Sequence, residues 1–364
     1  MPIFSACALM GGQAIGSQQQ MSHTIAGRLG ALTAASALTL AAAACSSGGV
    51  TATDASAQGG GRSTVTINFG DQEQDFETLL TDSGVLKGAD YKVNFVEFDS
   101  GPLVDAGFAA HRIDIGSMGD LPASLAVKSG LPVTAIAVSL PIGASEFLLA
   151  RPGVTAISQL RGKPVAYTTG TAEQAFALRA LHSAGLRQQD VQQVNVTLQE
   201  LGTALESGAA YASVVSVEQK VDYEQTHPDA VILATQSTVS PPSYDYLLGA
   251  NAALADPARL ADIDDLLKRI VEAENWEKSH QSLFVTDYYV DVEHQTPSVA
   301  KIILAAGGTT NYVPIGSAVE GALQQVVALM SSAGAGADYS VAPLFTAAAD
   351  ARFAAILKEV PQND

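Results

Sequence analysis

Three short polar segments carry hydrogen-bond donors that could capture a small anion. Ser100-Gly101, Gly119-Asp120 and Thr169-Gly170-Thr171 each stand between an apolar run and a segment with helical character. Free N–H groups and the positive end of a helix dipole make helix starts receptive to anions. None of the three contains Lys or Arg, so neutral donors favour a monoanion with several acceptor oxygens. The Asp120 carboxylate would repel that anion, and we expect it to turn away and cap its helix.

Alternating strands and helices must position these segments. Strands are expected at 93–98 and 112–115, and each is followed by a turn and a helix. The second turn is the glycine-rich break 116–120, and a third strand opens at Val133. Ligands bind open α/β sheets at the carboxyl ends of parallel strands. The spacing therefore predicts an α/β fold with its site at these strand ends.

The same segments carry a family resemblance. Residues 97–102 read E-F-D-S-G-P and residues 113–122 read I-D-I-G-S-M-G-D-L-P. They resemble the E-F-x-x-G-P and I-D-x-G-x-x-G-D-x-P segments of ABC-importer solute-binding proteins, in the branch for aliphatic sulfonates, taurine and nitrate. Residues 157–166 resemble that family's S-x-x-D-L-K-G-K-x-V-A, which opens its second lobe.

The resemblance implies a two-lobed, type II periplasmic-binding-protein-like fold. Lobe 1 is expected at residues 63–147 plus 245–364, and lobe 2 at 148–244. Two crossover strands, near Glu146–Arg151 and Tyr244–Gly249, would form a hinge, and the ligand would lie in the cleft between the lobes.

The resemblance also implies further ligand-facing residues. The family's first loop faces the ligand, and here it contains Asp71 and Gln72. After a later helix, the family's G-x-x-D-A-W-x-x-W-x-P is replaced, with Ser213 and Ser216 at the tryptophan positions and Glu218 at the proline. Loss of two indoles predicts a ligand tail bulkier than that of taurine. Alternatively one or both serines face away, with aromatic contact supplied by Tyr211, Tyr244 or Tyr246.

The implied function is capture of a sulfonate-type organic anion and its delivery to an ABC permease driven by a separate ATPase. The alternative ligands are nitrate or a small heterocycle such as an aminopyrimidine, held partly by Asp71 or Glu73. A lipoprotein without a transport role is a further alternative. No cofactor is expected, and the protein is expected to be a monomer.

The amino terminus predicts export and a lipid anchor. Arg28 precedes an apolar run that ends in small residues before Cys45 and a Ser/Gly-rich stretch. This pattern is typical of a lipoprotein signal over residues 1–44, lipidation at Cys45 and a flexible tether over 45–62. A plain secretory signal is the alternative, and Met21 is a candidate start. The anchor would hold the protein on the outer face of the cell membrane.

Composition and motifs argue against other classes. With 19 Lys and Arg against 37 Asp and Glu, the formal net charge is −18, which disfavours nonspecific nucleic-acid binding. The six His include no i,i+4 pair, so no metal site is predicted. G-x-S-x-G, the P-loop and a complete G-x-G-x-x-G are all missing from the sequence. An exported hydrolase therefore has no positive feature, and we expect no enzymatic activity.

Overall fold

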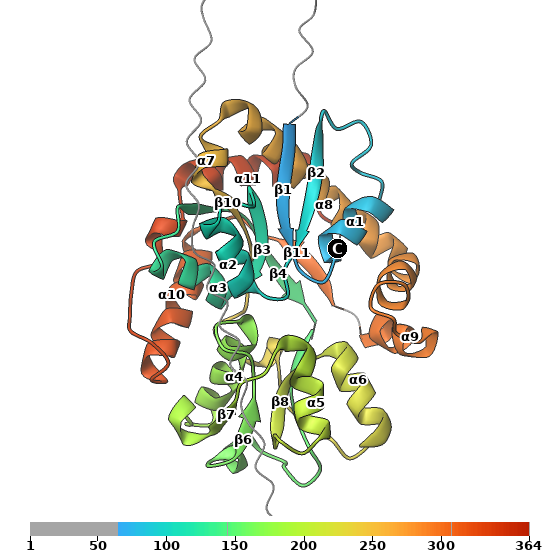
Figure 1. Cartoon of the computed structure of the whole chain (residues 1–364), viewed down its shortest axis with the longest axis vertical. Coiled ribbons are helices and arrows are strands. Elements are labelled where there is room, and N and C mark those ends of the chain that lie inside the picture. The colour runs from blue at the N-terminus through green and yellow to red at the C-terminus, as the bar shows by residue number, and fades with distance from the viewer. Residues whose placement is uncertain (1–64, 144, 307, 364) are drawn as a thin grey trace, which may run out of the picture. The chain divides into compact units, whose positions relative to one another are not determined.

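The computed structural model describes residues 65–143, 145–306 and 308–363, which belong to one compact unit. Two β-sheets with flanking helices make up this unit (Figure 1). No helix of the described residues is both long and apolar enough to cross a membrane. The predicted signal, Cys45 and the tether lie outside the described residues.

The first sheet has the strand order β11-β4-β10-β3-β1-β2. Its strands are β1 (Val65–Asp71), β2 (Tyr91–Glu97), β3 (Ile115–Gly119), β4 (Val133–Ile142), β10 (Asp245–Ala250) and β11 (Thr309–Tyr312). β1 pairs in parallel with β2 and β3, whereas β10 is antiparallel to β3 and β4. Strand residues such as Ile67, Phe69 and Ile115 are fully buried, as expected for a sheet covered on both faces.

Helices cover this sheet and connect its strands (Figure 1). Their bounds are α1 (Asp75–Asp82), α2 (Gly101–Ala109), α3 (Asp120–Lys128), α7 (Asn251–Leu254), α8 (Pro257–Val285), α9 (Pro297–Ala306), α10 (Ser317–Ser332) and α11 (Ala347–Glu359). A π-helical turn at Thr286–Val290 follows α8 and brings two adjacent tyrosines, Tyr288 and Tyr289, to the site described below.

The second sheet has the strand order β7-β6-β8-β5-β9. Its elements are β5 (Glu146–Ala150), β6 (Pro164–Ala166), β7 (Gln192–Val194), β8 (Ala212–Ser216), β9 (Val231–Thr235), α4 (Ala172–Ser183), α5 (Leu201–Glu206) and α6 (Val217–Thr226). β5 pairs with β8 along its whole length. The chain therefore crosses between the sheets just before β5, and it returns between β9 and β10 rather than within the predicted strands.

One local expectation was wrong. The predicted glycine-rich break at 116–120 contains the last four residues of β3, and α3 begins at Asp120 without an intervening loop. Met118 and Ser117 pair with Tyr246 and Leu247 of β10, which holds this segment extended. Gly116 is needed for packing rather than for a turn, because a Cβ there would lie 2.6 Å from Cγ1 of Val104.

Candidate functional site

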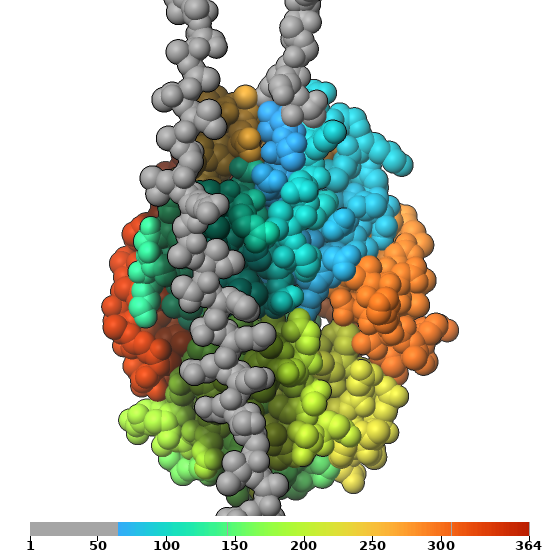
Figure 2. Space-filling view, in the orientation of Figure 1, coloured from blue at the N-terminus to red at the C-terminus, as the bar shows by residue number. Residues whose placement is uncertain are grey.

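A cavity of about 570 Å³ is lined by residues from both sheets. The β1–α1 loop, the end of β3 and the start of β10 line it from the first sheet. The start of β5, the first turn of α4 and the β8–α6 junction line it from the second. Figure 2 shows the face on which the blue and orange segments meet the green and yellow ones. This volume lies within the 300–1,000 Å³ of small-molecule sites.

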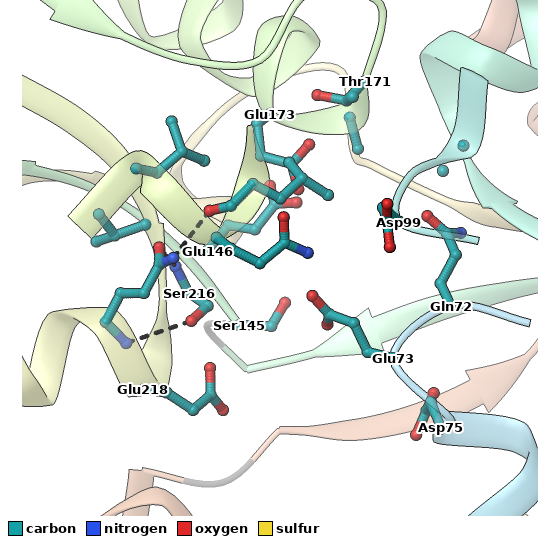
Figure 3. A pocket seen from close by; sticks show the side chains of 18 of the residues that line it. Gln72, Glu73, Asp75, Asp99, Ser145, Glu146, Thr171, Glu173, Ser216 and Glu218 are labelled. Atoms are coloured by element: carbon teal, nitrogen blue, oxygen red, sulfur yellow. Dashed lines mark hydrogen bonds between the residues drawn. The ribbon is translucent and has the colours of Figure 1, made fainter. Parts of the chain in front are cut away.

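Six of the twelve predicted ligand-binding residues line this cavity: Gln72, Gly101, Gly119, Thr171, Ser216 and Glu218. They include residues from all three predicted helix starts, which thus reach one cavity in the structure. The Gln72 side chain is held by a 2.9 Å hydrogen bond from its Nε2 to the Ser117 carbonyl. Ser216 caps α6, where its Oγ accepts from the Gln219 N–H (Figure 3).

The other six predicted residues lie outside the cavity lining: Asp71, Ser100, Asp120, Thr169, Gly170 and Ser213. Asp71 is fully buried, and its carboxylate accepts the N–H groups of Gln72, Phe76 and Glu77, so it caps α1. Ser213 is also fully buried and donates to the Leu201 carbonyl. One of the two serines therefore faces away, as the alternative interpretation allowed.

Two of the backbone donors proposed for an anion already have partners. The Thr169 N–H donates to Asn195 Oδ1 and the Gly170 N–H donates to Gln174 Oε1, each at 2.8 Å. The Thr171 hydroxyl donates to the Thr168 carbonyl at 2.9 Å. This helix start therefore offers an anion fewer free donors than its sequence predicts.

Asp120 turns away from the cavity, although not to cap its helix. Its Oδ2 accepts from the Arg179 guanidinium of α4 and, at 3.2 Å, from the Ser243 hydroxyl. The Asp120 and Arg179 side chains are 2% and 0% exposed. The Asp120 carboxylate, which was expected to repel an anion, thus belongs to a buried ion pair that joins α3 to α4.

Carboxyl groups dominate the cavity lining. None of the described residues that line it is Lys, Arg or His. Four glutamates surround the cavity, one each from the β1–α1 loop, β5, α4 and α6: Glu73, Glu146, Glu173 and Glu218 (Figure 3). Among residues 65–143, 145–306 and 308–363, nine carboxyl groups line it: Glu73, Asp75, Asp99, Glu146, Glu173, Glu218, Asp222, Asp245 and Glu293.

Burial and mutual repulsion raise the pKa values of these carboxyl groups. Burial among protein atoms, followed by the charges of Glu293, Glu218, Glu173 and Asp75, raises the pKa of Glu73 to about 7. Burial and neighbouring carboxylates raise the pKa of Asp75 and that of Asp245 to about 7 as well. Burial also raises the pKa of Glu146. Near neutral pH some of these carboxyl groups are therefore protonated, and a bound cation would favour their ionised form.

Sequence reasoning missed most of this acidic lining. It named Glu218 as a ligand-facing residue and Glu73 as a partner for a heterocycle. The other seven acids are scattered over the chain without a motif, and only the fold brings them together. The chain's net charge of −18 was the available signal, and it does not say where the acids gather. The described residues contain no group of three or more His, Cys, Asp or Glu placed to hold a metal ion.

A family model described as "NMT1/THI5 like" matches residues 82–274. Two curated relatives come from Escherichia coli (strain K12). The "Putative aliphatic sulfonates-binding protein" is 30% identical over 119 residues, which is 32% of this chain and 37% of that protein. The "Taurine-binding periplasmic protein" is 24% identical over 132 residues, 36% of this chain and 41% of that protein. The alignments thus span about two fifths of these relatives.

Solved structures confirm the predicted fold class. The alkanesulfonate-binding protein SsuA from Xanthomonas axonopodis pv. citri, bound to MOPS, aligns with a TM-score of 0.69 and 18% identity, covering 78% of this chain and 99% of that one. The periplasmic aliphatic sulphonate-binding protein SsuA from Escherichia coli aligns with a TM-score of 0.66 and 21% identity, covering 74% of this chain and 88% of that one. The described residues thus have the periplasmic-binding-protein fold.

Proposed function

Because the chain belongs to the NMT1/THI5-like family, we propose that it is the solute-binding component of an ABC importer. The observation that carries the proposal is the cavity of about 570 Å³, which both sheets line. A solute that touches both lobes stabilises the closed state by its differential affinity for that state. The closed protein would deliver the solute to a membrane permease that a separate ATPase drives, and the chain itself would act as a monomer without catalysis.

Two ligand classes have support. The names of the curated relatives favour a sulfonate-type anion, which could use the helix starts at Gly101 and Gly119. The acidic lining favours the alternative ligand, a small heterocycle such as an aminopyrimidine, in its cationic form and in contact with Glu73. An aminosulfonate such as taurine combines both chemistries, because its ammonium group could face the carboxylates.

A thermal-shift panel tests the function. It should compare taurine, alkanesulfonates, arylsulfonates, nitrate, an aminopyrimidine and aliphatic amines. A ligand at 100 times its Kd stabilises the folded protein by about 2.7 kcal/mol, which shifts the melting temperature by several degrees. We expect at least one class to raise the melting temperature and to show 1:1 binding by calorimetry. Failure of every class to bind would refute the proposed function.

Cys45 would carry the membrane anchor. A single cysteine follows the apolar run and precedes the Ser/Gly-rich stretch, and an exported, extracytoplasmic position agrees with the periplasmic relative. Cys45→Ser should abolish labelling with a radioactive fatty acid and release the protein from the membrane fraction. Equal labelling of the variant and the wild type would contradict lipidation at this residue.

A further inference from the structure

A small side pocket adjoins the main cavity. It has a volume of about 100 Å³ and shares Asp75, Ser117 and Asp245 with the main cavity. Its remaining lining includes Tyr246 on β10 and Glu274 on α8, together with Tyr312 on β11. Acidic and phenolic groups therefore converge on a space that admits only a small chemical group.

One polar side chain of this pocket is buried and has no partner among the described residues. Tyr246 is 1% exposed, and its hydroxyl makes no hydrogen bond with any of them. Glu274 is 7% exposed; burial and the charges of Glu277 and Asp75 raise its pKa, whereas the Lys278 ammonium lowers it. Buried polar groups are nearly always hydrogen-bonded, and an exception calls for an explanation such as an absent ligand.

The charge of the side pocket selects the ligand group. Asp75, Asp245 and Glu274 are acceptors when ionised, and the Tyr246 hydroxyl can also accept a hydrogen bond. A protonated amine offers three donors and a positive charge, so one such group satisfies several of these acceptors at once. The pocket's tyrosine rings add surface for a cation and its methylene groups. A sulfonate would place a further negative charge beside the carboxylates.

The main cavity extends this acidic surface. Glu73, Glu146 and Glu173 line it beyond the side pocket, and Oε2 of Glu146 is a buried atom with no hydrogen-bond partner among the described residues. Lys278 lies near Glu274, but its amine donates to Asn311 and to the Asn363 carbonyl. One ammonium group would therefore leave most of the acidic lining uncompensated.

We infer that the ligand is an aliphatic polyamine whose terminal ammonium group enters the side pocket beside Glu274 and Tyr246, while a second ammonium group faces Glu73, Glu146 and Glu173. The inference rests on the proposed function and defines its ligand class. A metal ion is a poorer occupant, because the described residues contain no group of acids placed to hold one.

Calorimetric titration of the full-length protein at pH 8 tests this assignment. The probes are spermidine, 1,4-diaminobutane, butylamine, 1,4-butanediol, taurine and ethanesulfonate. We expect spermidine and 1,4-diaminobutane to bind at least ten-fold more tightly than butylamine, which carries a single ammonium group. Butanediol and ethanesulfonate should not bind, and polyamine affinity should fall as the salt concentration rises.

Variants locate the terminal amine. Glu274→Gln should weaken 1,4-diaminobutane binding by roughly ten- to a hundred-fold, the usual effect of losing a hydrogen bond to a charged group. Tyr246→Phe preserves the ring and should weaken binding by several-fold. Glu272→Gln is the matched control, because Glu272 lies on the same helix and lines neither cavity. It should leave affinity unchanged.

The outcomes separate this inference from the proposed function. Binding of taurine or ethanesulfonate without binding of the amines would overturn the inference and leave the solute-binding function intact. Binding of no probe would overturn both. Diamine binding that Glu274→Gln and Tyr246→Phe leave unchanged would overturn the assignment of the side pocket.

Discussion

Removing the positive member of the Asp120–Arg179 pair should destabilise the protein strongly. Arg179→Met would leave the Asp120 charge buried, with the Ser243 hydroxyl as its remaining side-chain donor. Breaking a buried ion pair by removing one partner typically costs about 3–5 kcal/mol. We expect the upper part of that range, because Asp120 already lies close enough to Glu146 and Asp245 to raise their pKa values.

A double variant shows whether the loss of stability comes from the unpaired Asp120 charge or from lost packing. Nε and Nη1 of Arg179 and Oδ1 of Asp120 are buried and have no hydrogen-bond partner in the part of the chain that the structure describes, so the native pair is incompletely satisfied. Asp120→Leu combined with Arg179→Met removes both charges, and its stability should return to within about 1 kcal/mol of the wild type. Arg161→Met is the control, because Arg161 pairs with Asp190 while 60% exposed, and such pairs contribute about 0–1 kcal/mol.

Equilibrium urea unfolding at pH 8, without ligand, measures these effects. Circular dichroism and the fluorescence of Trp276, the only tryptophan, should give coincident transitions if unfolding is two-state. A loss of less than about 1 kcal/mol in Arg179→Met would refute the claim that Asp120 depends on Arg179. A double variant as unstable as the single one would show that packing, rather than charge, explains the loss.

Three further outcomes follow from the geometry. Gly119→Ala should weaken ligand binding, because its Cβ would lie 2.6 Å from that of Ala172, and Ala172→Gly in the same chain should restore affinity by calorimetry. Asp71→Ala should lower the free energy of unfolding by about 1–2 kcal/mol through loss of the α1 cap, while ligand affinity measured by calorimetry stays unchanged. Because folding raises the pKa of Asp75 and Asp245 to about 7, their stabilising contribution is complete below about pH 4 and is lost as pH rises through 7. The ligand-free protein should therefore melt at a higher temperature at pH 5 than at pH 8, and substituting both residues with Asn should reduce that difference in a calorimetric scan.

The sequence predicted the architecture well because local patterns decide it. The signals used were local ones: the alternation of strands and helices, the glycines that end helices, and the two family segments. Each depends only on residues that are close together in the sequence. The prediction failed at Gly116–Gly119, where glycines suggested a turn. Tertiary packing decides that segment, since Gly116 makes room for Val104 while β10 pairs alongside.

The site was less predictable because its chemistry depends on which side chains face the same space. Ser213 and Ser216 lie on one strand, yet Ser213 is buried against Leu201 and Ser216 lines the cavity. Asp71 and Glu73 are likewise two residues apart, but the first caps a helix and the second faces the cavity. No spacing rule separates a capping carboxylate from a ligand-facing one when both suit the start of a helix.

The buried pair and the acidic cavity form one electrostatic system. Burial, followed by the charges of Glu173, Asp245 and Asp120, raises the pKa of Glu146, and Arg179 only partly offsets this rise. The pair therefore leaves the neighbouring carboxyl groups with little compensation, and burial adds to their preference for protons. Near neutral pH some of these carboxyl groups are therefore protonated. A cationic ligand would favour release of those protons and would pair with the ionised carboxylates. Its binding would therefore relieve the repulsion among the carboxylates that the fold brings together. An anion would have to overcome the same repulsion, and the backbone donors that the sequence assigned to it at Thr169 and Gly170 are already occupied.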